Sequence, residues 1–224
     1  LHLNDTHSHI EPQRSGSLAG RGGVIEQAAY IDSVRCVEGK GNVILLHAGD
    51  FSQGTSYFKV FNGDIEVEGA NAMQFDALCL GNHEFDNGLD ELARRLKNLN
   101  APVVCANYDF SGTVLDGLVK PYVILNKAGK KIGVVGLLAD MSNLVSADIA
   151  PLLKYQNPAE VAAKYAGQLK AEGCDLVIAL THIGYELVTY TDIDLAENSR
   201  NLVIISIPKI IPSIVTLSTS YNKS

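Results

Sequence analysis

The sequence predicts a layered α/β domain with an α+β element in its second half. Strand and helix signals alternate through the first hundred residues, which is typical of β-α-β units in a largely parallel sheet. The alternation is interrupted at residues 122–137, where two apolar segments flank Lys127-Ala128-Gly129-Lys130, a sequence typical of a hairpin. Polar clusters follow several apolar segments, and ligands of open α/β sheets bind beyond the carboxyl ends of the strands.

The elements of the first half follow from hydrophobic spacing. Short apolar runs predict strands at residues 1–4, 43–46, 75–80 and 102–106. Apolar residues at helical spacing predict helices at residues 22–38, 64–74 and 88–98. The last of these helices places Leu92, Ala93 and Leu96 on one face and basic residues in its final turns, where they complement the helix dipole.

The second half contains the predicted hairpin, one helix and one buried strand. The hairpin pairs residues 122–126 with residues 131–137, and the buried strand covers residues 176–180. A helix is predicted at residues 158–172, because Pro158 suits a first helical turn and Gly173 a helix stop. We expect the domain to cover residues 1–201 and to lack the start of its first strand, since the chain begins inside an apolar run without a methionine.

Composition narrows the class of protein. The chain has 224 residues, 46% of them hydrophobic and 19% charged, which is typical of a globular domain. A net charge of −7 argues against binding to the phosphate backbone of nucleic acids. There is no apolar run long enough to span a bilayer. The four cysteines include no C-x-x-C pair, and Cys79 and Cys105 are expected to be buried, reduced thiols.

Five polar clusters at the predicted strand ends carry the residue types that bind divalent metals. They are Asp5-Thr6-His7, Gly49-Asp50, Gly81-Asn82-His83-Glu84, Asp86 and Thr181-His182. Carboxylates, amide oxygens and imidazoles are ligands for such ions. Any one cluster would be weak evidence, but the joint pattern predicts a single metal site collected from four strands.

Each cluster has a chemical reason to take part. Asp5 and His7 are two residues apart, so in extended chain both side chains point the same way. Asp50 follows a small residue, and a carboxylate in such a place can bridge two cations about 3.5–4 Å apart. Asn82 offers a neutral amide oxygen, and His182 offers an imidazole from a separate strand.

His83 and Asp86 predict a different function. A histidine that is next to a ligand residue but is itself free can reach a substrate, and a nearby carboxylate can hold its tautomer and stabilise the imidazolium. The expected role of the pair is to stabilise phosphoryl oxygens or to protonate a leaving oxygen. The remaining candidates are more simply structural: His9 and His47 as structural or solvent-facing side chains, and Asp64, Asp109 and Asp148 as helix-start or loop carboxylates.

These motifs resemble those of the calcineurin-like metallophosphoesterases, and most closely the bacterial 5′-nucleotidase branch of that superfamily. The resemblance covers about residues 1–200 and rests on Asn4-Asp5-Thr6-His7, Gly49-Asp50, the block from Gly81 to Asp86, Cys105-Ala106-Asn107 and Thr181-His182. It implies the metallophosphoesterase fold, a two-sheet β-sandwich flanked by helices, with the active site on loops at the strand ends.

The resemblance also implies roles for these residues. Two divalent ions, Zn, Mn, Fe or Mg, would be bound, the first by Asp5 and His7, the second by Asn82 and His182, with Asp50 as the bridge and with His83 and Asp86 as the catalytic dyad. The family hydrolyses phosphate esters by in-line attack of a metal-bound hydroxide, and the 5′-nucleotidases remove phosphate from nucleotides. The family is usually exported, which implies a periplasmic or cell-surface location.

Two departures from the family pattern concern the end of the chain. The family has a Gly-His-x-His block after one further strand, giving each metal one more ligand, whereas here no histidine follows His182. The C-terminal nucleotide-binding domain of the longer enzymes is also absent. The tail at residues 202–224 is rich in Ile, Ser and Thr and has no acidic residue, and we interpret it as the product of a frameshift or truncation near residue 202.

Three functions are therefore compatible with the sequence. The first is a 5′-nucleotidase-type hydrolase of phosphoric monoesters whose activity is impaired by the missing His-x-His motif. The second is a non-catalytic remnant that binds metal or nucleotide. The third is another phosphoesterase of the superfamily, acting on cyclic phosphodiesters or sugar phosphates, because fold and core chemistry do not fix the substrate.

Overall fold

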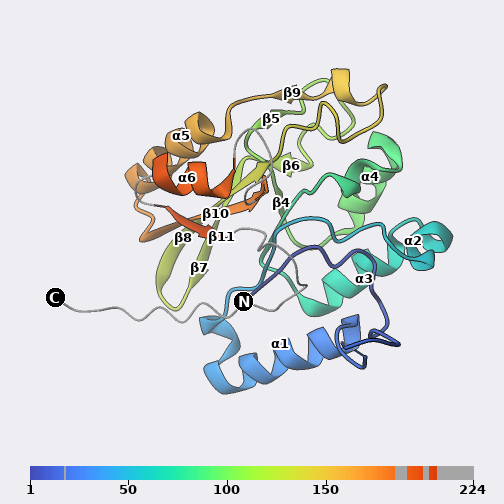
Figure 1. Cartoon of the computed structure of the whole chain (residues 1–224). Coiled ribbons are helices and arrows are strands. Elements are labelled where there is room, and N and C mark those ends of the chain that lie inside the picture. Colours follow the sequence, from blue (N-terminus) through green and yellow to red (C-terminus); the bar gives the residue numbers. More distant parts are fainter. Residues whose placement is uncertain (18, 185–190, 199–201, 206–224) are drawn as a thin grey trace.

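Two β-sheets pack face to face and carry helices on their outer sides in the computed structural model of this chain (Figure 1). The structure describes residues 1–17, 19–184, 191–198 and 202–205. The first sheet is parallel, in the order β1 (His2–Leu3), β2 (Leu46–His47), β3 (Ala77–Cys79), β4 (Val103–Val104) and β6 (Val119–Lys120). The second sheet has the order β11 (Val203–Ile205), β10 (Leu176–His182), β8 (Lys130–Leu138) and β7 (Tyr122–Lys127).

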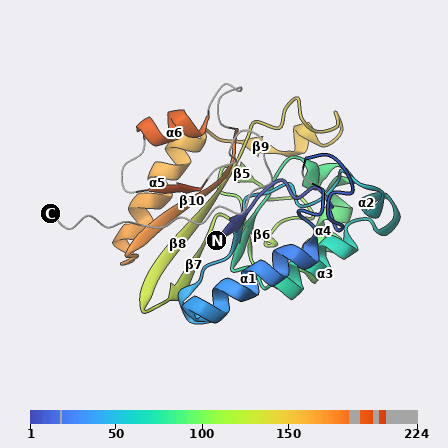
Figure 2. The same cartoon turned by 60° about the horizontal axis from the view of Figure 1, so that its bottom comes forward.

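Helices cover the outer face of each sheet, which makes four layers (Figure 2). The first sheet packs against α1 (Val24–Glu38), α3 (Asp64–Met73) and α4 (Gly88–Asn98). The second packs against α5 (Pro158–Ala171) and α6 (Asp192–Asn198). The connections contain α2 (Ser56–Phe61), the 3-10 turns Lys40–Asn42, His83–Phe85 and Ala150–Leu152, and the antiparallel pair β5 (Tyr108–Asp109) and β9 (Lys154–Tyr155). The predicted two-sheet sandwich flanked by helices is confirmed.

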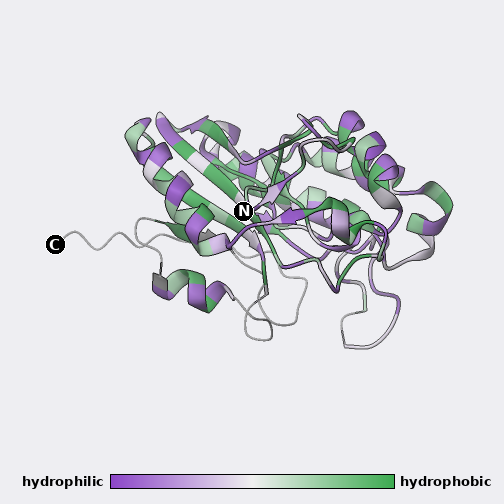
Figure 3. Ribbon diagram, turned by 90° about the horizontal axis from the view of Figure 1, so that it is seen from above, coloured by the Kyte–Doolittle hydropathy of each residue, from purple (hydrophilic) through white to green (hydrophobic). Residues whose placement is uncertain are grey.

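Successive side chains of a strand point to opposite faces of the sheet, so alternate residues belong to different layers of the core. In and after β3, Ala77 and Cys79 face the second sheet, whereas Leu78 and Leu80 face the helices of the first. Figure 3 shows the central strands largely in the hydrophobic colour and the helices in both colours. Because both faces of these strands are buried, their sequences are continuous apolar runs and not alternating ones.

The two sheets meet backbone to backbone at Gly136 of β8. A Cβ atom at this position would lie 2.2 Å from the carbonyl oxygen of Val104, so no larger residue fits without moving the strands apart. The amide of Ala106 donates to the carbonyl of Gly136 at 2.8 Å. Nearby, the Asn107 side chain donates to the carbonyl of Leu138 and accepts from its amide, at 2.7 and 2.9 Å.

The helices and the hairpin match their predicted positions well. Residues 88–98 are helical as expected, and β7 and β8 form the predicted antiparallel hairpin, with Lys127 opposite Lys130. Ala128 and Gly129 form its turn with φ of 49° and 71°, the left-handed values of a two-residue hairpin loop. The strands of the first sheet are shorter than predicted, and only Leu46 of residues 43–46 belongs to β2, whereas β10 runs two residues further than the predicted strand 176–180.

The sheet continues past the domain boundary expected at residue 201. Strand β11 pairs in parallel with β10, with Ile178 opposite Val203 and Leu180 opposite Ile205. The rest of the tail, residues 206–224, lies outside the described residues. Within the described ranges, no helix has both the length and the apolar character needed to cross a membrane.

The cysteines are free thiols. Cys79, Cys105 and Cys174 are buried and Cys36 is exposed, as was expected for Cys79 and Cys105. Burial raises the pKa of Cys105 to about 12, so this thiol is protonated and acts as a small core side chain.

Candidate functional site

The carboxyl ends of four strands converge at one place between the two sheets. Asp5 follows β1, Asp50 follows β2, the Asn82-His83 pair follows β3, and His182 ends β10. The first three loops come from neighbouring parallel strands of one sheet, and His182 comes from the other sheet. Their convergence explains why residues far apart in the sequence share one site.

Two groups of ligand-type atoms share a single carboxylate. In one group, atoms of Asp5, Asp50 and His182 lie within 4.8 Å of one another, and in the other, atoms of His7, Asp50 and His83 do. Asp50 Oδ2 is 3.2 Å from His182 Nε2 and 3.8 Å from His7 Nε2. Asp50 is therefore placed between the two groups, as a bridging residue must be.

The other predicted site residues flank these groups. Asn82 is half-buried and begins the 3-10 turn that contains His83, directly beside Gly81. Asp86 ends the same turn, and its Oδ2 lies 2.8 Å from His83 Nδ1. The two side chains of that pair are about a third exposed, 33% for His83 and 30% for Asp86, so this edge of the site is open to solvent.

Unusual backbone conformations hold the loops in place. Asp5, His7 and Asp50 have φ of 47°, 43° and 54°, values that L-residues rarely adopt and that cluster at functional sites. The amide of His7 donates to the carbonyl of Asp50 at 3.1 Å, so the first loop is pinned to the second. A Cβ at Gly81 would lie 2.1 Å from Asp50 Oδ1, which explains the glycine there.

Asp50 and His182 each shift the pKa of the other. Burial opposes protonation of His182, but its contact with Asp50 outweighs burial and raises its pKa to about 9. The pKa of Asp50 is lowered, because the hydrogen bond and charge of His182 outweigh the effect of burial. His182 Nδ1 donates to the carbonyl of Ala48 at 2.8 Å, which leaves Nε2 directed at Asp50. A backbone carbonyl on one ring nitrogen is the arrangement that orients a metal-binding imidazole.

Asp5 and His7 form a second pair of this kind. His7 Nε2 lies 3.5 Å from Asp5 Oδ1, and the Asn4 amide donates to Asp5 Oδ2 at 2.7 Å. The hydrogen bond to Asp5 raises the pKa of His7. Burial alone would raise the pKa of Asp5, yet the hydrogen bond from His7 and its other polar contacts lower it. Both oxygens of Asp5 thus face polar partners at the edge of the cluster.

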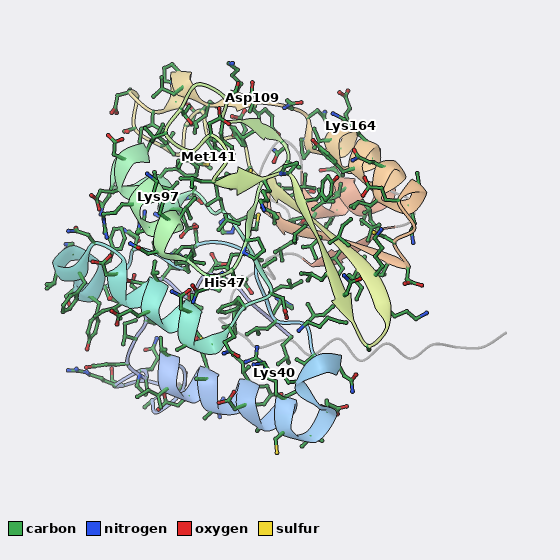
Figure 4. The ribbon with its side chains drawn as sticks, turned by 180° about the vertical axis from the view of Figure 1, so that it is seen from behind. Lys40, His47, Lys97, Asp109, Met141 and Lys164 are labelled. Atoms are coloured by element: carbon green, nitrogen blue, oxygen red, sulfur yellow. The ribbon has the colours of Figure 1, made fainter. Side chains whose placement is uncertain are left out.

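Histidines outside the two groups have structural surroundings. His9 is exposed, with Nδ1 3.1 Å from the carbonyl of Thr6. His47, labelled in Figure 4, is buried between Thr6 Oγ1 and the amide of Gly49, at 3.1 and 3.2 Å. Burial lowers the pKa of His47 to about 3, so the ring is neutral and connects Thr6 to the amide of Gly49 through hydrogen bonds.

The three remaining carboxylates lie at helix starts and in surface segments. Asp64 begins α3 and pairs with Arg94 at 2.5 Å, Asp109 in β5 pairs with Lys154 at 3.3 Å, and Asp148 is exposed. None of them belongs to the two ligand groups among the described residues.

Two buried charged residues lie behind the site, and the sequence pattern assigns neither of them a role. Glu84 is fully buried and accepts backbone hydrogen bonds from the loop that carries Asp50. Arg95 is also fully buried, and its place among the late basic residues of α4 predicted only that it complements the helix dipole. The available signal was position, because Arg95 follows Leu92 by three residues and therefore lies close to the apolar face of α4.

Comparison with known proteins identifies the class. A sequence model of the calcineurin-like phosphoesterases matches residues 1–204, and the chain belongs to this family. It is similar to a snake venom 5′-nucleotidase of Naja atra, with 36% identity over 194 residues that cover 83% of this chain and 36% of that protein.

Solved structures agree with this assignment. A 5′-nucleotidase precursor from Thermus thermophilus superposes with a TM-score of 0.82 and 35% identity, covering 92% of this chain and 40% of that one. The NAD nucleotidase of Haemophilus influenzae gives a TM-score of 0.79 with 32% identity, covering 92% and 37%. The chain thus spans roughly a third to two fifths of the length of these relatives.

Proposed function

We propose that this chain is the metal-binding domain of a 5′-nucleotidase-type enzyme, a hydrolase that removes phosphate from phosphoric monoesters. The observation that carries the proposal is the position of Asp50, whose carboxylate belongs to both groups of ligand atoms. Two metal ions that act together on a phosphoryl group lie about 3.5–4 Å apart, and one carboxylate placed between two groups of donors can bind both.

The donor types suit two divalent ions. As the family pattern implies, we assign Asp5 and His7 to the first ion and Asn82 and His182 to the second, with Asp50 between them. The ligand atoms that lie close together divide differently, with Asp5 beside His182 and His7 beside His83, so this assignment rests on the family pattern. The contact from His182 Nδ1 to Ala48 and the contact from Asn4 to Asp5 orient these ligands in advance. Bound ions supply Lewis-acid activation of water and neutralise charge on phosphoryl oxygens. Carboxylate, amide and imidazole donors suit Mn, Fe, Zn or Mg, so the identity of the ions is not part of the proposal.

His83 and Asp86 act on the substrate in this proposal. The Asp86 carboxylate, 2.8 Å from His83 Nδ1, keeps the proton on that nitrogen or stabilises the imidazolium, which leaves Nε2 to face the substrate. In the imidazolium form, Nε2 can donate a hydrogen bond to a phosphoryl oxygen or a proton to the leaving oxygen. Their exposure supports this role, because a group that meets substrate must be reachable.

A nucleotide is the substrate class that the relatives support. Those from Naja atra and Thermus thermophilus are described as 5′-nucleotidases, and the one from Haemophilus influenzae as an NAD nucleotidase. An exported location is part of the same proposal, supported by the description of several relatives as venom proteins. We place the catalytic domain at residues 1–201, with strand β11 pairing just beyond that boundary, and regard the tail as atypical.

One observation favours a second function, a binding module without turnover. No histidine follows His182 in the sequence, so each ion would lack the ligand that the family's His-x-His motif supplies. Changes in residues that merely orient ligands cost about 10–100-fold in metal affinity or activity, and the loss of a direct ligand should cost more. The domain would then bind metal or nucleotide weakly and not catalyse.

A phosphatase assay with matched binding measurements tests these alternatives. The chain is given Mn²⁺, Zn²⁺ or Mg²⁺ with AMP, UDP-glucose or an aryl phosphate, and Asp50→Asn is the control. We expect metal-dependent release of phosphate that Asp50→Asn lacks. Metal binding by calorimetry without turnover would support the binding module. Absence of metal binding would refute the hydrolase and the metal-binding module, and equal hydrolysis by wild type and Asp50→Asn would show contamination.

A further inference from the structure

We propose that Arg95 on α4 is a positioning residue that sets the geometry of the Asp50 turn through Ser52 and Glu84. This role rests on the proposed function, because it concerns how the proposed bridging carboxylate is held. Arg95 touches none of the predicted ligands itself. It acts through backbone groups and one hydroxyl on the loops that carry them.

The first link is the carboxylate of Glu84, which joins two loops of the site. Its Oε2 accepts hydrogen bonds from the amides of Asp50 and Gly81, at 2.9 and 2.7 Å, and its Oε1 accepts from the amide of Ser52 at 3.0 Å. These three amides belong to the turn after β2 and to the turn after β3. The side chain is completely buried, so water does not replace these contacts when they are lost.

The second link is the guanidinium of Arg95, which holds Ser52 and the main chain of Glu84. Nη1 donates to Ser52 Oγ and Nη2 donates to the carbonyl of Glu84, each at 2.5 Å. Arg95 is completely buried, and its guanidinium carbon lies 5.5 Å from the centre of the Phe58 ring. A Cβ at Gly63 would lie 2.5 Å from Arg95 Cδ, so the neighbouring turn is shaped around this side chain.

Arg95 and Glu84 carry opposite charges, and each reduces the free-energy cost of burying the other. A buried carboxylate is unfavourable without a nearby positive charge, and a buried guanidinium is unfavourable without acceptors. Arg95 is a positive charge near the Glu84 carboxylate, and its Nη1 and Nη2 both find acceptors, whereas Nε has no hydrogen-bond partner among the described residues. Hydrophobic packing alone does not require an arginine at this position, since Leu92 and Leu96 pack on the same region of α4.

The consequence for the site is a fixed orientation of Asp50. Its backbone has the left-handed φ of 54°, a conformation that must be enforced by its surroundings. With the amide of Asp50 fixed by Glu84, the amide of His83 donates to Oδ1 at 3.0 Å, and Oδ2 faces His182 and His7. Removing the guanidinium frees Ser52 and leaves Glu84 without its buried counter-charge, so the turn can relax and Asp50 can rotate.

The adjacent arginine provides a matched control. Arg94 pairs with Asp64 and Glu91 on the surface, at 2.5 and 2.9 Å, and its side chain is 37% exposed. Arg95→Met and Arg94→Met therefore remove the same charge and a similar volume from consecutive residues of one helix. Ser52→Ala is a milder variant that removes only the hydroxyl held by Arg95, and Arg95→Lys keeps the charge without the two-pronged contact.

The experiment measures Mn²⁺ binding by calorimetry and backbone amide exchange by NMR on each folded variant. We expect Arg95→Met to weaken Mn²⁺ binding by about 10–100-fold, the range for residues that orient metal ligands. We also expect faster exchange of the Asp50, Ser52 and Gly81 amides without metal, while amides in β8 and β10 are unchanged. Ser52→Ala should shift both readouts in the same direction by less, Arg95→Lys should partly restore them, and Arg94→Met should alter neither.

Other outcomes overturn the role of Arg95 and are separable from failure of the proposed function. Unchanged Mn²⁺ affinity and unchanged exchange in Arg95→Met would refute it, as would a uniform rise in exchange across the whole domain, which marks a purely structural residue. If Arg95→Met does not fold, unchanged readouts in Ser52→Ala refute it instead. If the wild type binds no Mn²⁺, the proposed function fails, and the three amides still decide whether Arg95 holds the turn.

Discussion

Substitution of His83 distinguishes two roles for this residue, a metal ligand and an acid that faces the substrate. One of its ring nitrogens belongs to the group with His7 and Asp50, yet its Nδ1 is held by Asp86 at 2.8 Å. For a substrate-facing role we expect His83→Asn to lower kcat about 10²–10⁴-fold, the usual contribution of a positioned acid or base. Mn²⁺ affinity, measured by calorimetry, should stay close to that of the wild type. A loss of Mn²⁺ affinity comparable to that of Asp50→Asn would instead make His83 a ligand.

His47 predicts a pH dependence of stability in the metal-free chain. Its pKa is about 3 in the folded state against 6.5 when exposed, so below pH 6.5 the unfolded chain binds a proton that the folded chain refuses. Stability is therefore lost as the pH falls from about 6.5 towards 3, by about 1.4 kcal/mol per pH unit for this one group. His47→Gln can keep both hydrogen bonds but does not titrate. Its free energy of unfolding should therefore fall less steeply with decreasing pH, by about 1.4 kcal/mol per pH unit. Urea titrations at pH 7, 6, 5 and 4 measure the difference, and parallel curves would contradict it.

Candidate ligands are easier to recognise from the sequence than the residues that hold their loops in place. Asp5, Asp50 and His182 are recognisable because ligand-type side chains stand at or just beyond the ends of apolar runs. Arg95 carries no such mark, since a late basic residue in a helix ordinarily faces solvent and complements the dipole. Its burial depends on the loops of Ser52 and Glu84, which become its neighbours only in the fold.

The crossing of β8 over β4 limits what the strand elements tolerate. A methyl group at Gly136 would lie 2.2 Å from the carbonyl oxygen of Val104, and strand backbone cannot yield as a flexible side chain can. We expect Gly136→Ala to lower the free energy of unfolding by about 1–3 kcal/mol, as overpacking does. Gly167→Ala is the matched control, because nothing lies within 4 Å of the added methyl group in α5. It should raise stability by about 0.5–1 kcal/mol. Equal effects of the two changes in urea unfolding would contradict the close crossing.

Elements were predictable where their pattern is local. The helix at Gly88–Asn98 has a strong period and polar ends, and the hairpin of β7 and β8 has a two-residue turn, so both were placed closely. The parallel strands of the first sheet proved shorter, because an apolar run shows burial and not hydrogen bonding to a neighbour. Helix α2 at Ser56–Phe61 was missed, although Thr55 caps it through the Tyr57 amide, because six residues are too few for a periodic signal.

At the scale of the whole molecule, the proposed metal site joins the two sheets. Asp5, Asp50 and Asn82 follow strands of the first sheet, whereas His182 belongs to the second. Bound metal would therefore connect the layers through Asp50 and His182, which already lie 3.2 Å apart. Folding and metal binding should then be linked, because the unfolded chain has no preformed site.

This linkage predicts that Mn²⁺ stabilises the folded domain and that His182 carries much of the effect. At a free Mn²⁺ concentration about 100 times the dissociation constant, the free energy of unfolding should rise by about 2.7 kcal/mol. In His182→Ala, a tenfold weaker affinity would reduce the gain at the same concentration to about 1.4 kcal/mol. His9→Ala is the control, since its exposed imidazole belongs to neither ligand group, and it should respond to Mn²⁺ as the wild type does. Urea unfolding with Mn²⁺ and with a chelator measures each gain. Because a metal held by the first sheet alone would stabilise His182→Ala as much as the wild type, equal gains would place the site on one sheet and remove His182 from the ligand set.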